Sequence, residues 1–187
     1  MKKSPIYLYG AIIIMEGIFL MFSKSYTFDT IKNSIGIALT FGAIVAFFEA
    51  LSRYRKQVEF SYHEIHVLAM MVYGVSVLFF ADTLESLKTF TLFLFIFYTF
   101  SEIVFCNWLF NLDRGVINKI VLIRVFLALL VGIGIIVTMF YQGVNETLVI
   151  EGFGVLFIII GINVLLYTPV IKPKELKQAE NNAQNFS

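Results

Sequence analysis

Hydrophobic residues form six long runs along the chain, and short polar stretches separate them. The runs cover residues 5–22, 31–51, 62–80, 84–110, 116–141 and 147–167. A helix needs about 20 mainly apolar residues to cross the hydrocarbon core of a bilayer, and the runs are close to this length. They are continuous, whereas strands of a membrane barrel alternate apolar and polar residues over about 10 positions. The pattern predicts an all-α polytopic membrane helix bundle with six transmembrane helices.

One short segment recurs in the second, fourth and sixth runs. Residues 40–45 (Thr-Phe-Gly-Ala-Ile-Val) return as residues 99–104 (Thr-Phe-Ser-Glu-Ile-Val) and, more weakly, as residues 159–164 (Ile-Ile-Gly-Ile-Asn-Val). In the odd-numbered runs, marker glycines follow one another at intervals of 57 and 58 residues: Gly17, Gly74 and Gly132. The recurring segment and the marker glycines therefore repeat at nearly the same interval. This predicts tandem hairpins, arranged as parallel repeats about an axis along the membrane normal. The hairpins are residues 5–51, 62–110 and 116–168.

The composition supports a membrane protein and excludes other classes. Of 187 residues, 59% are hydrophobic and only 14% are charged, which is too apolar for an ordinary soluble domain. The lipid bilayer is therefore the expected partner, and nothing suggests nucleic acid. The single cysteine, Cys106, excludes an intrachain disulfide and a multi-cysteine metal site.

The distribution of basic residues predicts the orientation. Eleven of the 14 lysines and arginines belong to the termini, to the connections around residues 53–56 and 114–119, or to the start of the fifth run. Only Lys24, Lys32 and Lys88 belong to the other connections. By the positive-inside rule, both termini are cytoplasmic in an inner or plasma membrane. Residues 1–168 form the membrane domain, whose first helix is retained rather than cleaved as a signal peptide, and residues 169–187 form a flexible cytoplasmic tail.

Glu16 is an ionisable residue inside the first predicted span, about 16 Å along the helix from Pro5. Such residues face the interior of a bundle, a cavity or a partner, because their exposure to lipid is costly. Two interpretations are open. Glu16 is either a site for a proton or cation, or a protonated side chain that hydrogen-bonds to another helix.

Glu102 and Arg124 lie at similar depths, each about 11 Å from the inner end of its predicted helix. They can pair across the bundle as a structural ion pair. The alternative is a polar vestibule that faces the cytoplasm. Its residues would be Tyr9, Glu49, His66, Glu102, Arg124 and Asn163. Tyr9, His66 and Arg124 each precede a marker glycine by eight residues, so they occupy one repeat position.

No sequence motif predicts an enzyme, a metal site or a cofactor. The nucleophile elbow, the P-loop and the dinucleotide-binding glycine motif are not found. His63 and His66 flank Glu64, but the spacing differs from that of zinc proteases. A role of His66 in sensing pH is favoured over metal binding, because imidazole titrates near neutrality.

The glycine pattern resembles that of the HdeD-like family of bacterial membrane proteins. The resemblance is carried by Gly17-Ile18-Phe19, by Ile35-Gly36-Ile37 and by Phe41-Gly42-Ala43-Ile44, which leads to the basic inner connection at Arg53. It covers residues 8–168. The resemblance implies a short membrane repeat linked to acid resistance at the inner membrane, and it supplies no catalytic residues.

These observations leave three functional hypotheses. The first is a non-enzymatic plasma-membrane protein, linked to acid or envelope stress, that stabilises the membrane or holds a membrane-protein partner or a second copy of itself. The second is a small transporter or channel for protons or a solute, which would use Glu16, His66, Glu102 and Arg124. The third, an enzyme acting on lipid, requires a cavity that is lined by these polar residues and open to the bilayer.

Overall fold

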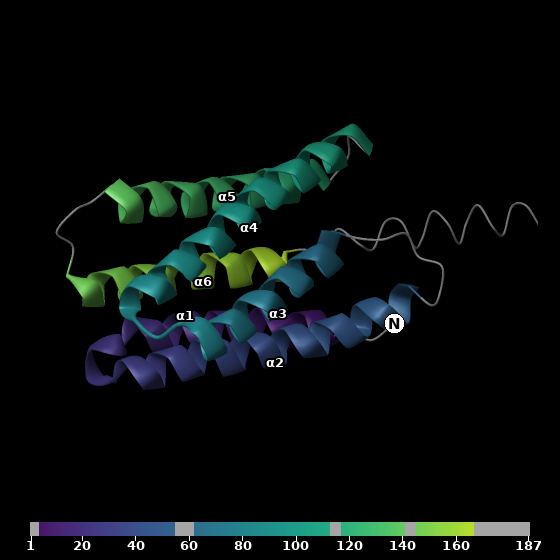
Figure 1. The fold of residues 1–187 in the computed structure, drawn as a ribbon. Coiled ribbons are helices and arrows are strands. Elements are labelled where there is room, and N and C mark those ends of the chain that lie inside the picture. The colour runs from purple at the N-terminus through teal and green to yellow at the C-terminus, as the bar shows by residue number, and fades with distance from the viewer. Residues whose placement is uncertain (1–3, 55–61, 113–116, 141–144, 167–187) are drawn as a thin grey trace, which may run out of the picture.

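The protein is helical throughout the part that the computed structural model describes (Figure 1). The backbone is described for residues 4–54, 62–112, 117–140 and 145–166, and the side chains for residues 6–48, 65–107, 119–138 and 145–166. The helices are α1 (Ser4–Met21), the short 3-10 helix η1 (Ser23–Ser25), α2 (Phe28–Tyr54), α3 (Tyr62–Phe80), α4 (Leu84–Leu112), α5 (Ile117–Phe140) and α6 (Glu146–Leu165). Each predicted span corresponds to one α-helix, so the all-α prediction is confirmed. The predicted tail, residues 169–187, lies outside the described residues.

Four helices contain segments long and apolar enough to cross a membrane: Phe28–Phe48, Leu84–Asn107, Lys119–Thr138 and Glu146–Leu165. The described parts of α1 and α3 contribute shorter apolar segments, Ile6–Met21 and Ile65–Phe80. Large hydrophobic side chains are exposed on all six helices, among them Met15, Phe48, Phe79, Phe93, Phe126 and Leu148. Such a surface suits lipid rather than water, because exposed apolar patches of this extent are rare on soluble monomers.

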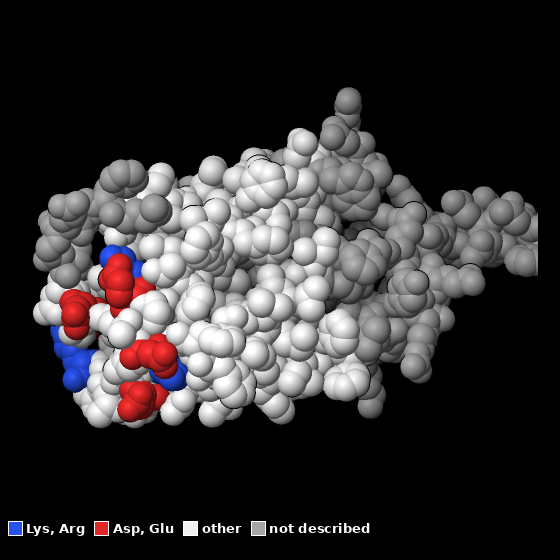
Figure 2. Space-filling model, in the orientation of Figure 1, with Lys and Arg blue, Asp and Glu red and all other residues white. Residues whose placement is uncertain are grey.

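The charged side chains visible in Figure 2 gather at one end of the bundle, where α1 turns into α2. We call this the turn end, because η1, the α3–α4 turn and the start of α6 all lie there. Three ion pairs join its residues: Lys24 with Glu151, Lys32 with Asp82, and Lys88 with Glu85. The visible middle of the described surface is uncharged. This arrangement matches a polar membrane interface next to an apolar band.

Polar residues at the turn end fix the start of each even-numbered helix. The hydroxyl of Thr27 accepts a hydrogen bond from the backbone of Thr30 at 3.4 Å, and Asn145 accepts one from Thr147 at 3.2 Å. Thr83 and Ser86 cap each other reciprocally before α4. These bonds satisfy amides that a helix leaves unpaired at its N-terminus. Because of its cap, α2 starts at Phe28, three residues before the apolar run.

The helices pack in a closed ring in the order of the chain. Each packs against its neighbours in sequence, and α1 also packs along α6, which brings the first and last helices together. The contacts between α1 and α6 and between α2 and α3 are the most extensive. The tightest contacts therefore join helices of different predicted hairpins.

Glycines permit this close approach. A Cβ atom added to Gly17 would lie 2.5 Å from the carbonyl oxygen of Gly154, and one added to Gly154 would lie 2.6 Å from the carbonyl oxygen of Gly17. The other two marker glycines also face the preceding even-numbered helix, Gly74 against Thr40 and Gly132 against Thr99. Small residues at helix crossings allow backbones to touch, which is how membrane helices gain packing contacts.

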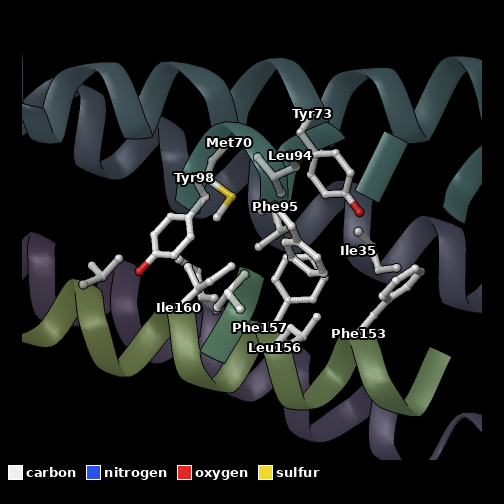
Figure 3. Packing of buried hydrophobic residues seen from close by; sticks show 14 of the residues in the cluster. Ile35, Met70, Tyr73, Leu94, Phe95, Tyr98, Phe153, Leu156, Phe157 and Ile160 are labelled. Carbon is white, nitrogen blue, oxygen red and sulfur yellow. The ribbon is translucent and has the colours of Figure 1, made fainter. Parts of the chain in front are cut away.

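Aromatic rings fill the middle of the bundle. Phe95 of α4 makes edge-to-face contacts with Phe153 and Phe157 of α6, with ring centroids 5.8 and 5.2 Å apart. Phe95 and Phe157 lie between Tyr98 and Tyr73 (Figure 3). An apolar layer thus separates two groups of buried polar residues.

Candidate functional site

Seven buried polar or sulfur-bearing side chains from five helices form what we call the ion-pair cluster. Its members are Tyr9 of α1, His66 of α3, Tyr98, Glu102 and Cys106 of α4, Arg124 of α5 and Asn163 of α6. Each is at most 3% exposed. Tyr98, Glu102 and Cys106 follow one another at steps of four, so they share one face of α4.

The centre of the cluster is an ion pair between α4 and α5. The Nε and Nη2 atoms of Arg124 both lie 2.7 Å from Oε1 of Glu102. The same oxygen accepts a hydrogen bond from the thiol of Cys106 at 3.4 Å. The guanidinium also lies 5.5 Å from the ring centroid of Phe105. Glu102 and Arg124, which the helical rise places within reach of each other, are therefore in direct contact.

Asn163 connects this pair to the rest of the cluster. Its backbone carbonyl accepts a hydrogen bond from Nη1 of Arg124 at 3.3 Å. Its side-chain amide donates a hydrogen bond to the hydroxyl of Tyr98. Asn163 thereby ties α6 to both α4 and α5.

His66 and Tyr9 extend the cluster to α3 and α1. The hydroxyl of Tyr9 is hydrogen-bonded to Nδ1 of His66 at 3.3 Å. The imidazole also packs edge-on against Tyr98, with ring centroids 5.3 Å apart. Tyr9, His66 and Arg124, which share one repeat position in the sequence, thus belong to one connected cluster.

A second group, which we call the Glu16 cluster, lies toward the turn end. Ser34 of α2 donates a hydrogen bond to Oε2 of Glu16 at 2.9 Å, and the hydroxyls of Tyr73 and Thr91 are hydrogen-bonded at 2.8 Å. Each bond joins the two helices of one predicted hairpin and spans 18 residues. The third hairpin has Val131 and Val149 at this spacing.

Members of the two clusters lie two helical turns apart on the same helices. Three helices carry one member of each cluster seven residues apart: Tyr9 and Glu16, His66 and Tyr73, and Tyr98 and Thr91. Seven residues correspond to two turns, or about 10.5 Å. The clusters therefore form two polar layers on either side of the apolar layer.

The predicted site residues divide between these layers. His66, Glu102, Arg124 and Asn163 belong to the ion-pair cluster together with Tyr9, whereas Glu16 lies in the other layer. The side chains of Glu49, His63 and Glu64 lie outside the described residues. The roles of Tyr73 and Ser34 were missed, although Tyr73 directly precedes a marker glycine, as Glu16 does.

An apolar groove of about 460 Å³ lies between α3 and α4. Its lining includes Leu68, Val72, Phe93 and Phe97, with Tyr73 and Ser76 as its polar residues. None of the charged members of the two clusters lines this groove. It lacks the polar lining that the lipid-enzyme hypothesis requires.

The clusters define a helical membrane protein with a polar core. Within the described part of the chain, no three histidine, cysteine or acidic side chains converge as metal ligands. Comparison of the chain with protein-family models, with curated proteins and with solved structures found no match.

Proposed function

We propose that the protein is a non-enzymatic, six-span protein of the inner or plasma membrane whose polar core is structural. Its role is to stabilise the membrane or hold a membrane-protein partner, as in the acid or envelope stress response that the family resemblance implies. Both termini are cytoplasmic, and the three hairpins are tandem repeats. The lipid bilayer is its first partner.

The main observation that supports this proposal is the direct ion pair between Arg124 and Glu102. A transport site must exchange its ligand with water, whereas this guanidinium has its carboxylate at 2.7 Å and is 3% exposed. Intramembrane charges that pair in this way avoid the cost of an isolated charge in hydrocarbon. The pair and its hydrogen bonds join α4, α5 and α6, which is what a structural core requires.

Two further observations support six spans and the repeat. The turns after α1 and α3 lie at the charged turn end with the start of α6, as expected if every hairpin crosses the membrane and returns. Gly74 and Gly132 each face the preceding even-numbered helix, and Gly17 faces α6, the last even-numbered helix. The hydrogen bonds of Glu16 and Tyr73 share one spacing. Tandem copies of one hairpin account for both.

A transporter of protons or a small solute is the second candidate. It is favoured by one observation: Oε1 of Glu16 is buried and has no hydrogen-bond partner among the described groups. In that case Glu16 would exchange the ligand, and His66, Glu102 and Arg124 would supply the rest of the pathway.

Proteoliposomes distinguish the two candidates. With a trapped pH dye and an imposed membrane potential, we expect wild-type protein to give the same proton flux as protein-free vesicles, because the ion pair closes the core. In a host lacking the protein, we expect the double variant E102L/R124M to restore growth under acid or envelope stress as well as wild type does. A flux that Glu16→Gln or Glu102→Leu abolishes would contradict the structural role and establish transport.

A further inference from the structure

We propose that Glu16 is a proton-binding site within the membrane, located where α1 packs against α2 and reached from the turn end. Its carboxyl is neutral when the proton is bound, and the ligand is the proton itself. The inference rests on the membrane location proposed above. It requires neither the stress role nor transport.

Only one of the two oxygen atoms of the Glu16 carboxyl has a hydrogen-bond partner among the described groups. Glu16 is 4% exposed, and only its Oε2 atom has a hydrogen-bond donor, the hydroxyl of Ser34 at 2.9 Å. Its Oε1 atom is buried with no partner among the described groups. An ionised carboxylate needs donors or a cation at both oxygens, so this arrangement fits the neutral acid.

The lysines that the structure describes at the turn end pair with acidic residues other than Glu16. On α2, the ammonium of Lys32 pairs with Asp82 at 3.9 Å. On η1 and α6, Lys24 and Glu151 pair with each other at 3.5 Å. On α4, Lys88 pairs with Glu85 at 4.0 Å. Arg124 pairs with Glu102, and none of the ion pairs among the described residues includes Glu16.

The neighbouring helices present hydroxyls rather than charges. Tyr73 of α3 belongs to the same cluster, and its hydroxyl is hydrogen-bonded to Thr91 of α4. At the crossing of α1 with α6, Gly17 faces Gly154, and Phe153 beside it is buried. These groups place no cation beside the carboxyl, which favours the neutral acid.

Glu102 provides a comparison for Glu16 within the same protein. Both residues are buried glutamates on membrane helices, but Glu102 has two guanidinium nitrogens at 2.7 Å and Glu16 has none. A buried carboxylate with such a partner remains ionised, whereas one without a counter-ion takes up a proton instead. Glu16 also lies only five residues, or about 7.5 Å, from the end of α1 at Met21. Protons therefore reach it from that side.

Dicyclohexylcarbodiimide tests the proposal, because this apolar reagent reacts with protonated carboxyls inside membranes. The acid proton moves to one nitrogen of the carbodiimide, the carboxyl oxygen bonds to its central carbon, and the adduct rearranges to an N-acylurea without a leaving group. We expect full-length protein in nanodiscs to gain one adduct, which peptide mass spectrometry places on Glu16. Labelling should fall as the pH rises, and Glu102 should stay unlabelled.

Several outcomes would overturn the inference. They are no adduct on Glu16 at any pH, an adduct whose yield does not change with pH, or equal labelling of Glu102. Loss of labelling when Na⁺ is added at constant pH would identify a cation site instead. Glu16→Asp should retain the adduct and Glu16→Gln should lose it, while the mapping of wild-type protein requires no variant to fold. Failure to enter nanodiscs at all would contradict the membrane location rather than the site.

Discussion

Replacing Glu102 with leucine is expected to destabilise the folded protein by about 3–5 kcal/mol, the cost of leaving one partner of a buried ion pair behind. The remaining guanidinium of Arg124 cannot give up its proton, so its charge stays buried among α4, α5 and α6. Arg124→Met should cost less, about 1–3 kcal/mol, because the remaining carboxyl can become neutral. Unfolding in mixed dodecyl maltoside and SDS micelles, followed by circular dichroism, measures both.

The double variant E102L/R124M separates a structural pair from a functional one. Apolar side chains of similar volume often replace a buried pair without loss of stability, so the double variant should unfold close to wild type. The coupling free energy of the cycle should then be about as large as the costs of the two single variants added together. Additive losses in the double variant would show that the two residues do not act as a pair.

The second large effect is expected where α1 crosses α6. A methyl group at Gly17 would lie 2.5 Å from the carbonyl oxygen of Gly154 and 2.9 Å from the backbone nitrogen of Ile158. Both contacts are with backbone, so the helices must move apart. We expect Gly17→Ala to cost about 1–3 kcal/mol, the usual range for overpacking. The same unfolding experiment measures the loss.

Gly152→Ala is the matched control, because Gly152 lies on α6, the helix that Gly17 faces, and an added Cβ there would meet nothing within 4 Å. It should be neutral or stabilise the protein by up to about 1 kcal/mol through helix propensity. Gly132→Ala should have an intermediate effect, since its nearest contact is the side-chain methyl of Thr99 at 3.3 Å. Equal losses at Gly17 and Gly152 would contradict the close crossing of α1 and α6.

The helices were predictable because each apolar run must be helical throughout when lipid supplies no hydrogen bonds. The predicted and observed bounds of the span from Tyr62 to Phe80 agree. The start of α2 did not follow from hydrophobicity, because the cap at Thr27 is polar and precedes the apolar run. The ring was not predictable either, since the contact between α1 and α6 joins the two ends of the chain.

The polar residues were predictable as a set but not as two layers. The equal spacing of Tyr9, His66 and Arg124 before their marker glycines indicated that they share one repeat position. The helical rise indicated that Glu102 could reach Arg124. Hydrogen-bond partners depend on rotamers and on the rotation of each helix, which a sequence pattern does not specify. The partnership of Glu16 with Ser34, and its separation from the ion-pair cluster, therefore required the structure.

The most direct test of a closed polar core uses the protein's single cysteine. Cys106 is fully buried and lies 3.4 Å from Glu102, so its thiol reports whether water reaches the ion pair. In membrane-embedded protein treated with a small water-soluble methanethiosulfonate, we expect no modification of Cys106 until SDS unfolds the bundle. A Ser25→Cys variant, with its new thiol exposed at the turn end, should gain one adduct at once. If Cys106 in the folded protein reacts as fast as that exposed thiol, the core is an open vestibule and the structural role is wrong.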